Sequence, residues 1–106
     1  MTFKTINVSQ LKERLTEDNL VIADIRDANS FNQAHIPNSI NISNDNIAQF
    51  MMERDFEQPI IVVCYHGISS QGAANYLIAQ DFEDVYSLVG GFTDWALQCP
   101  DKIVNS

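Results

Sequence analysis

Basic residues are scarce in this sequence. Six lysines and arginines stand against fourteen aspartates and glutamates, which gives a net charge of −8 at pH 7. Such a surface repels both the phosphate backbone of nucleic acid and an anionic membrane. We therefore expect no nucleic-acid partner, and an anionic substrate needs a site whose positive potential comes from backbone amides rather than from side chains.

Long apolar runs are also missing. No stretch of the chain approaches the roughly 20 apolar residues that cross a bilayer, and residues 1–7 contain no apolar run of secretory length. From this we expect no membrane partner and a cytoplasmic location.

Cysteine and histidine are both rare. The soft metal ligands are Cys64, Cys99, His35 and His66, and none stands in a C-x-x-C or H-x-x-x-H spacing, so we expect no metal site. One alternative is a disulfide between the two cysteines. A reducing compartment and a chain long enough to bury a core make a structural disulfide unnecessary, however, and we expect two free thiols.

The composition is that of one globular domain. The 106 residues are 45% hydrophobic and 19% charged, which is typical of a folded chain and not of a disordered one. No repeat, low-complexity tract or long linker divides the sequence. Residues 1–106 are therefore expected to form a single domain around one core.

Apolar runs rich in β-branched residues predict strands at residues 20–23, 60–63 and 85–88. The first two runs are apolar at consecutive positions, which indicates that both faces are buried in a parallel sheet covered by helices. Shorter segments at residues 3–6 and 39–42 are candidates for additional edge strands.

Between these runs the apolar residues change to helical spacing. The sets that share a helical face are Leu11 with Leu15; Ile47, Phe50 and Met51; Ala73, Ala74, Leu77 and Ile78; and Phe92, Trp95 and Ala96. The candidate N-caps are Asn7 or Ser9, Asp27, Asn44, and Ser69 or Ser70. A turn is predicted before the last helix at Gly90-Gly91. Alternating strands and helices predict an α/β domain with a largely parallel sheet.

Cys64 stands where a buried strand meets a loop and a helix. Ligands of open α/β sheets bind at the carboxyl ends of the strands, and Cys64 directly follows the strand at 60–63. The turn through Gly67 into a helix starting near Ser69 is expected to aim backbone N–H groups inward, forming a nest that favours anions. The same field favours a thiolate, because cysteines at helix N-termini have pKa values lowered to about 3.5–7.5. We therefore favour a nucleophilic Cys64 over a small buried apolar residue, the interpretation kept for Cys99.

Three further polar residues, His66, Asp24 and Arg26, each have two interpretations. His66 is either a base for Cys64 or a side chain at the mouth of the site, and its place two residues along a tight loop favours the second. Asp24 and Arg26 either form a structural ion pair or contribute to the field of the site. We favour the structural role, because a partly buried pair usually orients its neighbours.

Four segments of the chain, in the same order, resemble signatures of the rhodanese family. They are VIADIRD at residues 21–27, FNQAHIPNSINI at 31–42, CYHGISS at 64–70 and GGFTDW at 90–95. The match spans essentially the whole chain and is similar above all to the short single-domain thiosulfate sulfurtransferases of that family. The resemblance implies a three-layer α/β/α fold around a central, mostly parallel five-stranded sheet.

The resemblance also implies the chemistry. Cys64 is then the catalytic nucleophile that takes a sulfur atom from the small-molecule donor thiosulfate and holds it as a persulfide. The backbone amides of the substrate-binding loop are expected to bind the transferred sulfur and the anionic donor, and this loop comprises Tyr65, His66, Gly67, Ile68, Ser69 and Ser70. A thiol or dithiol protein is the expected acceptor, and neither a metal nor an organic cofactor is implied.

The sequence departs from the family pattern at a few positions. Many rhodaneses carry an arginine where Ser69 stands, so weak binding of thiosulfate is the implied consequence. Ile68 is more apolar than the residue usual in the most similar pattern. Ala34 and Asn38 replace glycines of the His-Ile-Pro segment.

Two alternative functions use the same thiolate. A cysteine phosphatase requires C-x-x-x-x-x-R, but the position of that arginine is Ser70 and no arginine follows Arg54, so phosphate lacks its bidentate partner. The second alternative is a sulfur-relay or partner-binding module that is charged by another protein's persulfide. The sequence leaves this one open, because it needs the same nucleophile and the same amides.

Overall fold

A parallel sheet of five strands forms the centre of the computed structural model, which describes residues 2–105. The strands lie in the order β1-β5-β4-β2-β3, and each neighbouring pair is parallel. Their bounds are β1 Lys4–Ile6, β2 Val21–Asp24, β3 Ile40–Asn41, β4 Ile60–Val63 and β5 Val85–Leu88. The predicted strands are confirmed, including the two edge strands, with small shifts at some ends.

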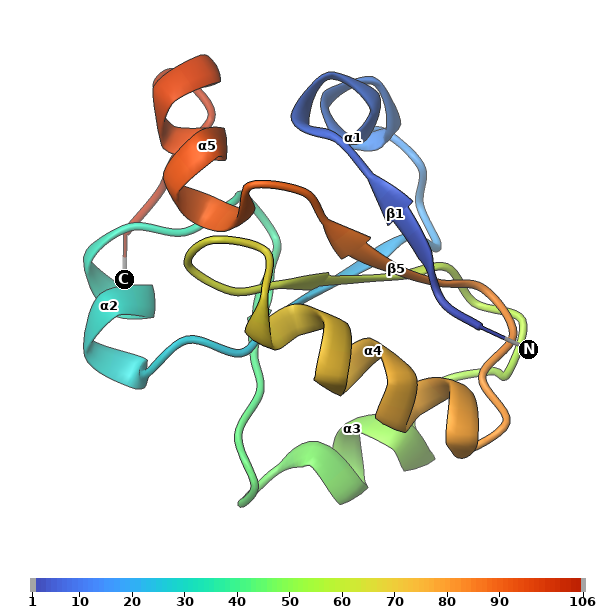
Figure 1. Cartoon of the computed structure of the whole chain (residues 1–106). Helices are drawn as coiled ribbons and strands as arrows, with labels where there is room; N and C mark the ends of the chain where they lie inside the picture. Colours follow the sequence, from blue (N-terminus) through green and yellow to red (C-terminus); the bar gives the residue numbers. More distant parts are fainter. Residues whose placement is uncertain (1, 106) are drawn as a thin grey trace.

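Helices cover both faces of this sheet (Figure 1). Within residues 2–105 they are α1 Val8–Arg14, α2 Ala28–Gln33, α3 Ile47–Met52, α4 Ser69–Ala79 and α5 Gly91–Gln98. On one face α1 and α5 pack together, and Leu11 and Trp95 join one apolar cluster there. On the other face lie α3 and α4, where Phe50 and Leu77 join a second cluster. This is a three-layer α/β/α arrangement, and it confirms the predicted fold.

The central strands are buried on both sides. All four residues of β2 and all four of β4 are buried. Along β4 the side chains alternate between the two clusters: Ile61 and Val63 join the α1–α5 side, and Ile60 and Val62 join the α3–α4 side. The uninterrupted apolar run in the sequence therefore follows from the strand's place between two layers of helices.

Of the four N-caps predicted from side chains, two are confirmed and two are wrong. Asn7 caps α1 in a capping box, and Asp27 caps α2. The prediction of Asn44 as the cap of α3 is wrong, because the helix begins only after Asn46. The side-chain oxygen of Asn46 accepts a hydrogen bond from the Ser43 N–H at 2.8 Å, which holds the preceding residues in a turn.

The start of α4 also differs from the sequence prediction. The prediction of Ser69 or Ser70 as the N-cap is wrong: Ile68 occupies the cap position, and no side chain caps the helix. The first N–H groups of a helix are ordinarily satisfied by such a side chain. Here the N–H of Ser70 is directed at the sulfur of Cys64 instead.

The segment after α5 packs back on the body of the molecule. Trp95 is fully buried, and its Nε1 donates to the carbonyl of Lys102 at 2.9 Å. Val104 pairs with His35 in an antiparallel bridge.

Asn38, which stands in the place of a glycine, has a φ of +67°, and asparagine enters this left-handed region more easily than most residues. The turn there is therefore kept without glycine.

Candidate active site

Cys64 lies at the carboxyl end of β4, the middle strand of the sheet. Residues 65–68 form a loop that leads directly into α4, as the sequence predicts. Two hydrogen bonds tie this loop to the start of α5. The N–H of Phe92 donates to the Cys64 carbonyl at 2.8 Å, and the N–H of Thr93 donates to the Tyr65 carbonyl at 3.0 Å.

Two glycines permit this close approach of the loop to α5. Gly67 has a φ of +86° and Gly91 a φ of +61°, both in the left-handed region. A Cβ added to Gly67 would lie 2.8 Å from the Gly90 nitrogen. A Cβ added to Gly91 would lie 2.5 Å from the carbonyl oxygens of Cys64 and Tyr65. Both positions therefore need glycine for space as well as for conformation.

Three hydrogen-bonding groups surround the sulfur of Cys64. The N–H of Gly67 donates to Sγ at 3.1 Å and the N–H of Ser70 donates at 3.3 Å. The Ser70 hydroxyl also lies 3.3 Å from Sγ: it accepts from the neutral thiol and donates to the thiolate. Burial of the thiol raises its pKa. The hydrogen bonds, led by the Ser70 hydroxyl and joined by the His66 amide, outweigh that effect, so the pKa of Cys64 is lowered from the ordinary value of 9.0. These contributions come from dipoles and not from a charged side chain.

The predicted site residues fall into two groups. Gly67 and Ser70 are buried and reach the sulfur, and Cys64 itself is only 4% exposed. The other loop residues are exposed, namely Tyr65, His66, Ile68 and Ser69. Within residues 2–105 the His66 ring makes no hydrogen bond with Cys64. The sulfur instead hydrogen bonds with two main-chain N–H groups and one hydroxyl.

A buried ion pair supports the loop from the neighbouring strand. Asp24, the last residue of β2, accepts from Arg26 at 2.8 Å, and both side chains are almost inaccessible. The guanidinium of Arg26 also lies 4.0 Å from the centre of the Phe92 ring and donates to the Ala34 carbonyl at 2.7 Å. The pair thus joins β2, α5 and the segment after α2, the geometry of a structural role.

The exposed rim of the loop is held by a contact that the sequence did not suggest. The hydroxyl of Tyr65 donates to the carboxylate of Asp27 and lies 2.7 Å from the hydroxyl of Ser30, both at the start of α2. This hydrogen bond from Tyr65, followed by the bond from the Ser30 N–H, lowers the pKa of Asp27 from 3.8 to about 2. The contact joins residues 38 apart in the chain.

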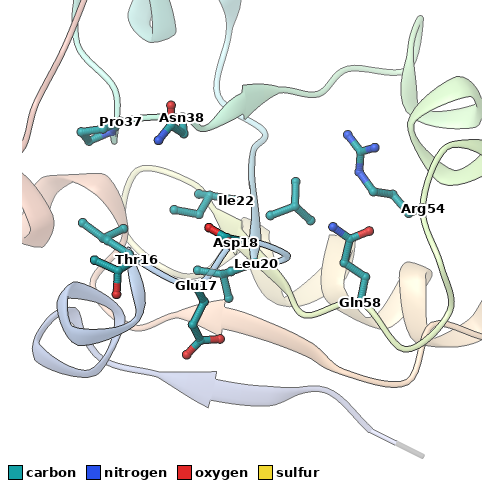
Figure 2. Close-up of a pocket in the computed structure, with 11 residues that line it drawn as sticks. Thr16, Glu17, Asp18, Leu20, Ile22, Pro37, Asn38, Arg54 and Gln58 are labelled. Carbon is teal, nitrogen blue, oxygen red and sulfur yellow. The ribbon is translucent and has the colours of Figure 1, made fainter.

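A pocket of about 600 Å³ lies elsewhere on the molecule (Figure 2). Pro37, Asn38, Arg54 and Gln58 are among its lining residues, and none of the residues 64–70 is. The Nε of Arg54 is buried there and has no hydrogen-bond partner within residues 2–105. The guanidinium of Arg54, which has no acidic partner in the described part of the chain, therefore lines this pocket, and the pocket contains no residue of the loop around Cys64.

Some features do not occur within residues 2–105. No group of three or more His, Cys, Asp or Glu side chains is arranged to hold a metal ion there. No helix of this part of the chain has the length and apolar character needed to cross a bilayer. Cys64 and Cys99 are both free thiols, as the sequence predicts.

Comparison with known proteins places the chain in a family. The model of the rhodanese-like domain matches residues 7–98. The chain belongs to the rhodanese family. A thiosulfate sulfurtransferase GlpE from Pseudoalteromonas translucida is 58% identical to this rhodanese over 97% of this chain and 98% of that protein. The protein of the same name from Shewanella oneidensis is 51% identical, over 89% of this chain and 93% of that protein.

Solved structures agree with this assignment. A rhodanese-like domain protein from Staphylococcus aureus has a TM-score of 0.77 and 28% identity to this rhodanese, covering 88% of this chain and 91% of that one. The family and the fold predicted from the four sequence segments are thereby confirmed.

Sequence reasoning missed two residues that shape this rhodanese site. Ser87 lies on β5, where its hydroxyl is 2.7 Å from that of Ser70. The available signal was a polar residue in a short apolar strand, and the structure buries it. Gly91 was assigned only to a turn, but its missing side chain is what lets the loop carbonyls approach α5.

Proposed function

We propose that this rhodanese is a thiosulfate sulfurtransferase and that Cys64 Sγ is the atom that carries the sulfur. The observation behind this proposal is the convergence of the Gly67 and Ser70 N–H groups on Sγ. Relatives 58% and 51% identical over most of their length bear the name thiosulfate sulfurtransferase, which supports thiosulfate as the donor. A local cluster of amide dipoles also offsets the repulsion that a net charge of −8 exerts on an anionic donor.

In the first half-reaction the Cys64 thiolate attacks the outer sulfur of thiosulfate. A bond forms between Sγ and that sulfur, the S–S bond of thiosulfate breaks, and its electron pair leaves with sulfite. The product is a persulfide whose outer sulfur is negatively charged. We propose that the amides of residues 65–70 bind this sulfur and the oxygens of the donor, because fixed dipoles stabilise developing negative charge without reorganising.

In the second half-reaction an acceptor attacks the outer sulfur. The persulfide S–S bond breaks, and its electron pair returns to Cys64 as a thiolate. Cyanide becomes thiocyanate in this step, and a thiol or dithiol protein, our proposed cellular acceptor, becomes a persulfide. The hydrogen bonds that lower the pKa of Cys64 also make it a better leaving group. Two free thiols suit a reducing compartment such as the cytoplasm.

The alternative is a relay that receives sulfur from another protein's persulfide. The observation in its favour is the lack of any lysine or arginine in residues 64–70, which leaves the loop without a cation for thiosulfate. Both functions use Cys64 in the same way. They differ in whether free thiosulfate is sufficient to charge it.

Mass spectrometry of the purified protein after exposure to thiosulfate tests the proposal. We expect the peptide containing Cys64 to gain the mass of one sulfur atom, and cyanide to remove it as thiocyanate appears. Cys64→Ser should gain nothing, whereas Cys99→Ala should gain sulfur like the wild type. Charging by a protein persulfide but not by thiosulfate supports the relay. Sulfur gained at a site other than Cys64 contradicts both.

A further inference from the structure

Ser87 lies directly behind the sulfur site, on β5 rather than in the loop. It is 1% exposed, and its Oγ is 2.7 Å from the Oγ of Ser70. Ser70 is fully buried, and its Oγ is 3.3 Å from Cys64 Sγ. Two buried hydroxyls and the sulfur therefore form one line of contacts that runs from β5 through the start of α4 to the end of β4.

The direction of these hydrogen bonds depends on the charge of the sulfur. A hydroxyl donates one hydrogen bond and accepts others, whereas a thiolate only accepts. When Cys64 is a thiolate, the Ser70 hydroxyl must donate to it, and the Ser70 oxygen is then left to find a donor. When Cys64 is a thiol, its own S–H is able to donate to that oxygen. The oxygen of Ser70 thus needs an outside donor mainly in the charged state.

Ser87 is the group placed to supply that donor. Within residues 2–105, the hydrogen-bond partners of Ser70 Oγ are Cys64 Sγ and Ser87 Oγ. Full burial of Ser70 keeps bulk water from substituting for Ser87. A buried polar atom without a partner is costly, so the chain of hydrogen bonds is complete when Ser87 donates to Ser70 and Ser70 donates to the anionic sulfur.

We propose that Ser87 is a positioning residue for sulfur transfer, which donates to Ser70 Oγ, directs the Ser70 hydroxyl hydrogen at Cys64 and so favours the thiolate over the thiol. This inference rests on the proposed role of Cys64 as the nucleophile. Ser87 then contributes to both half-reactions of sulfur transfer. More thiolate is present to attack thiosulfate, and the thiolate that leaves when the persulfide is discharged is more stable.

The charged and titratable groups around the site stand apart from this line of hydroxyls. α4 has no acidic or basic side chain. The groups at the carboxyl ends of the neighbouring elements are the paired Asp24 and Arg26 after β2, Tyr65 and His66 in the loop, and Asp94 on α5. On the elements that contact Ser87 the titratable groups are Tyr76 on α4, Tyr86 on β5 and Lys4 on β1, which lies over the Tyr86 ring. None of them hydrogen bonds with Ser87 within residues 2–105. A substitution of Ser87 therefore changes the hydroxyl line and leaves these charges where they are.

The test measures the alkylation rate of Cys64 against pH, in a Cys99→Ala background that leaves one thiol. Ser87→Ala should raise the pH midpoint by about half a unit to one unit, which is roughly a 3- to 10-fold loss of thiolate below the midpoint. Ser87→Thr keeps a hydroxyl and should restore the midpoint. An unchanged midpoint in Ser87→Ala, whatever its melting temperature, overturns the proposal.

A double-mutant cycle separates positioning from a general effect on packing. Ser70→Ala should raise the midpoint at least as far as Ser87→Ala does. Adding Ser87→Ala to Ser70→Ala should then produce no further shift, because the line is already broken. Equal shifts in both backgrounds overturn the proposal, since they show that Ser87 acts independently of Ser70.

The two proposals fail separately. If Ser87→Ala moves the midpoint but the wild type gains no sulfur from thiosulfate, the positioning role stands and the thiosulfate reaction does not. If the wild type gains sulfur and the midpoint does not move, only the role of Ser87 is lost.

Discussion

The two cysteines of this rhodanese are almost equally buried, with 4% of Cys64 and 2% of Cys99 exposed. Their surroundings differ. The sulfur of Cys64 has two N–H groups and a hydroxyl within hydrogen-bond distance. Cys99 ends α5 and packs in the apolar cluster that contains Trp95. Burial alone therefore does not distinguish a candidate nucleophile from a core residue, whereas the direction of nearby dipoles does.

The difference arises from where each cysteine lies along its element. Cys64 follows a parallel strand and precedes a helix, so the unsatisfied N–H groups at the helix start point toward it. Cys99 follows a helix, and the groups left over at a helix end are carbonyls, which do not stabilise an anion. The position of Cys64 thus favours a thiolate.

The strongest test of this comparison is alkylation of both thiols in one sample. We expect iodoacetamide to modify Cys64 roughly 1,000-fold faster than Cys99, because Cys99 is reached only through opening of the core whereas a short exposed loop covers Cys64. Since the pKa of Cys64 is lowered, its rate should hold below pH 9.0 and fall only as the pH drops through the folded-state pKa. Mass spectrometry of the two peptides over time gives both rates, and similar rates contradict the comparison.

The next effect in size comes from Gly91→Ala, which disturbs the amides around Cys64 and leaves Cys99 in place. The added Cβ would lie 2.5 Å from the Cys64 and Tyr65 carbonyl oxygens, so the loop must move. Loss of one aligned donor to a developing anion typically costs 100-fold or more, and we expect a loss of about 100-fold in kcat/KM for thiosulfate.

Gly72→Ala is the matched control for this variant. Gly72 lies inside α4, and a Cβ there would meet nothing within 4 Å. Alanine in a helix is favoured over glycine by roughly 0.5–1 kcal/mol, so this variant should be slightly more stable and equally active. Full activity in Gly91→Ala, with normal folding by circular dichroism, contradicts the claim that the loop needs this close contact.

The sequence was sufficient for the fold because its main signals are local. The consecutive apolar residues of β4 indicated burial on both faces, and the structure buries all four. Helix starts were less certain, because a cap depends on which of several neighbouring polar residues the turn selects. Asn46 rather than Asn44 precedes α3. Ile68, which has no capping side chain, precedes α4.

The site was predictable only in part, because some of its contacts join residues that are far apart in the sequence. The place of Cys64 between a strand and a helix is visible in the sequence, and so is the need for amides. The hydroxyl contact between Ser70 and Ser87 joins residues 17 apart on different elements. The contact between Tyr65 and Asp27 spans 38 residues. Such pairings follow from the order of strands in the sheet, which propensity and spacing do not specify.

A smaller effect is expected from Cys99→Ala. Removing the sulfur from the apolar cluster should lower the free energy of unfolding by about 1 kcal/mol, the usual cost of a small cavity. The variant should transfer sulfur at the wild-type rate, because no residue of the loop at 64–70 belongs to that cluster. Urea unfolding and a thiosulfate–cyanide assay measure the two quantities. A loss of activity without a loss of stability contradicts the passive role of Cys99.

The smallest effect concerns the rim of the loop, where Tyr65 donates to Asp27. Tyr65→Phe removes the hydrogen bond that contributes most to the lowered pKa of Asp27, so that pKa should rise from about 2 toward 3.8. The sign follows from linkage: a carboxyl whose pKa is lowered in the folded state stabilises the fold above its unfolded pKa, and that stabilisation disappears as the pH falls through about 2. Asp27 is exposed, so the effect on stability is small.

Carboxyl chemical shifts followed against pH give the titration of Asp27 directly, and Tyr76→Phe is the matched control. Tyr76 is as exposed as Tyr65, at 45% against 41%, but lies on α4 and has no contact with Asp27 within residues 2–105. The control should leave the Asp27 midpoint unchanged. If both variants shift it equally, the hydrogen bond from the loop is not the cause. A shift in Tyr65→Phe alone shows that the loop around Cys64 is fastened to α2 at its rim, a restraint that the buried Cys99 does not need.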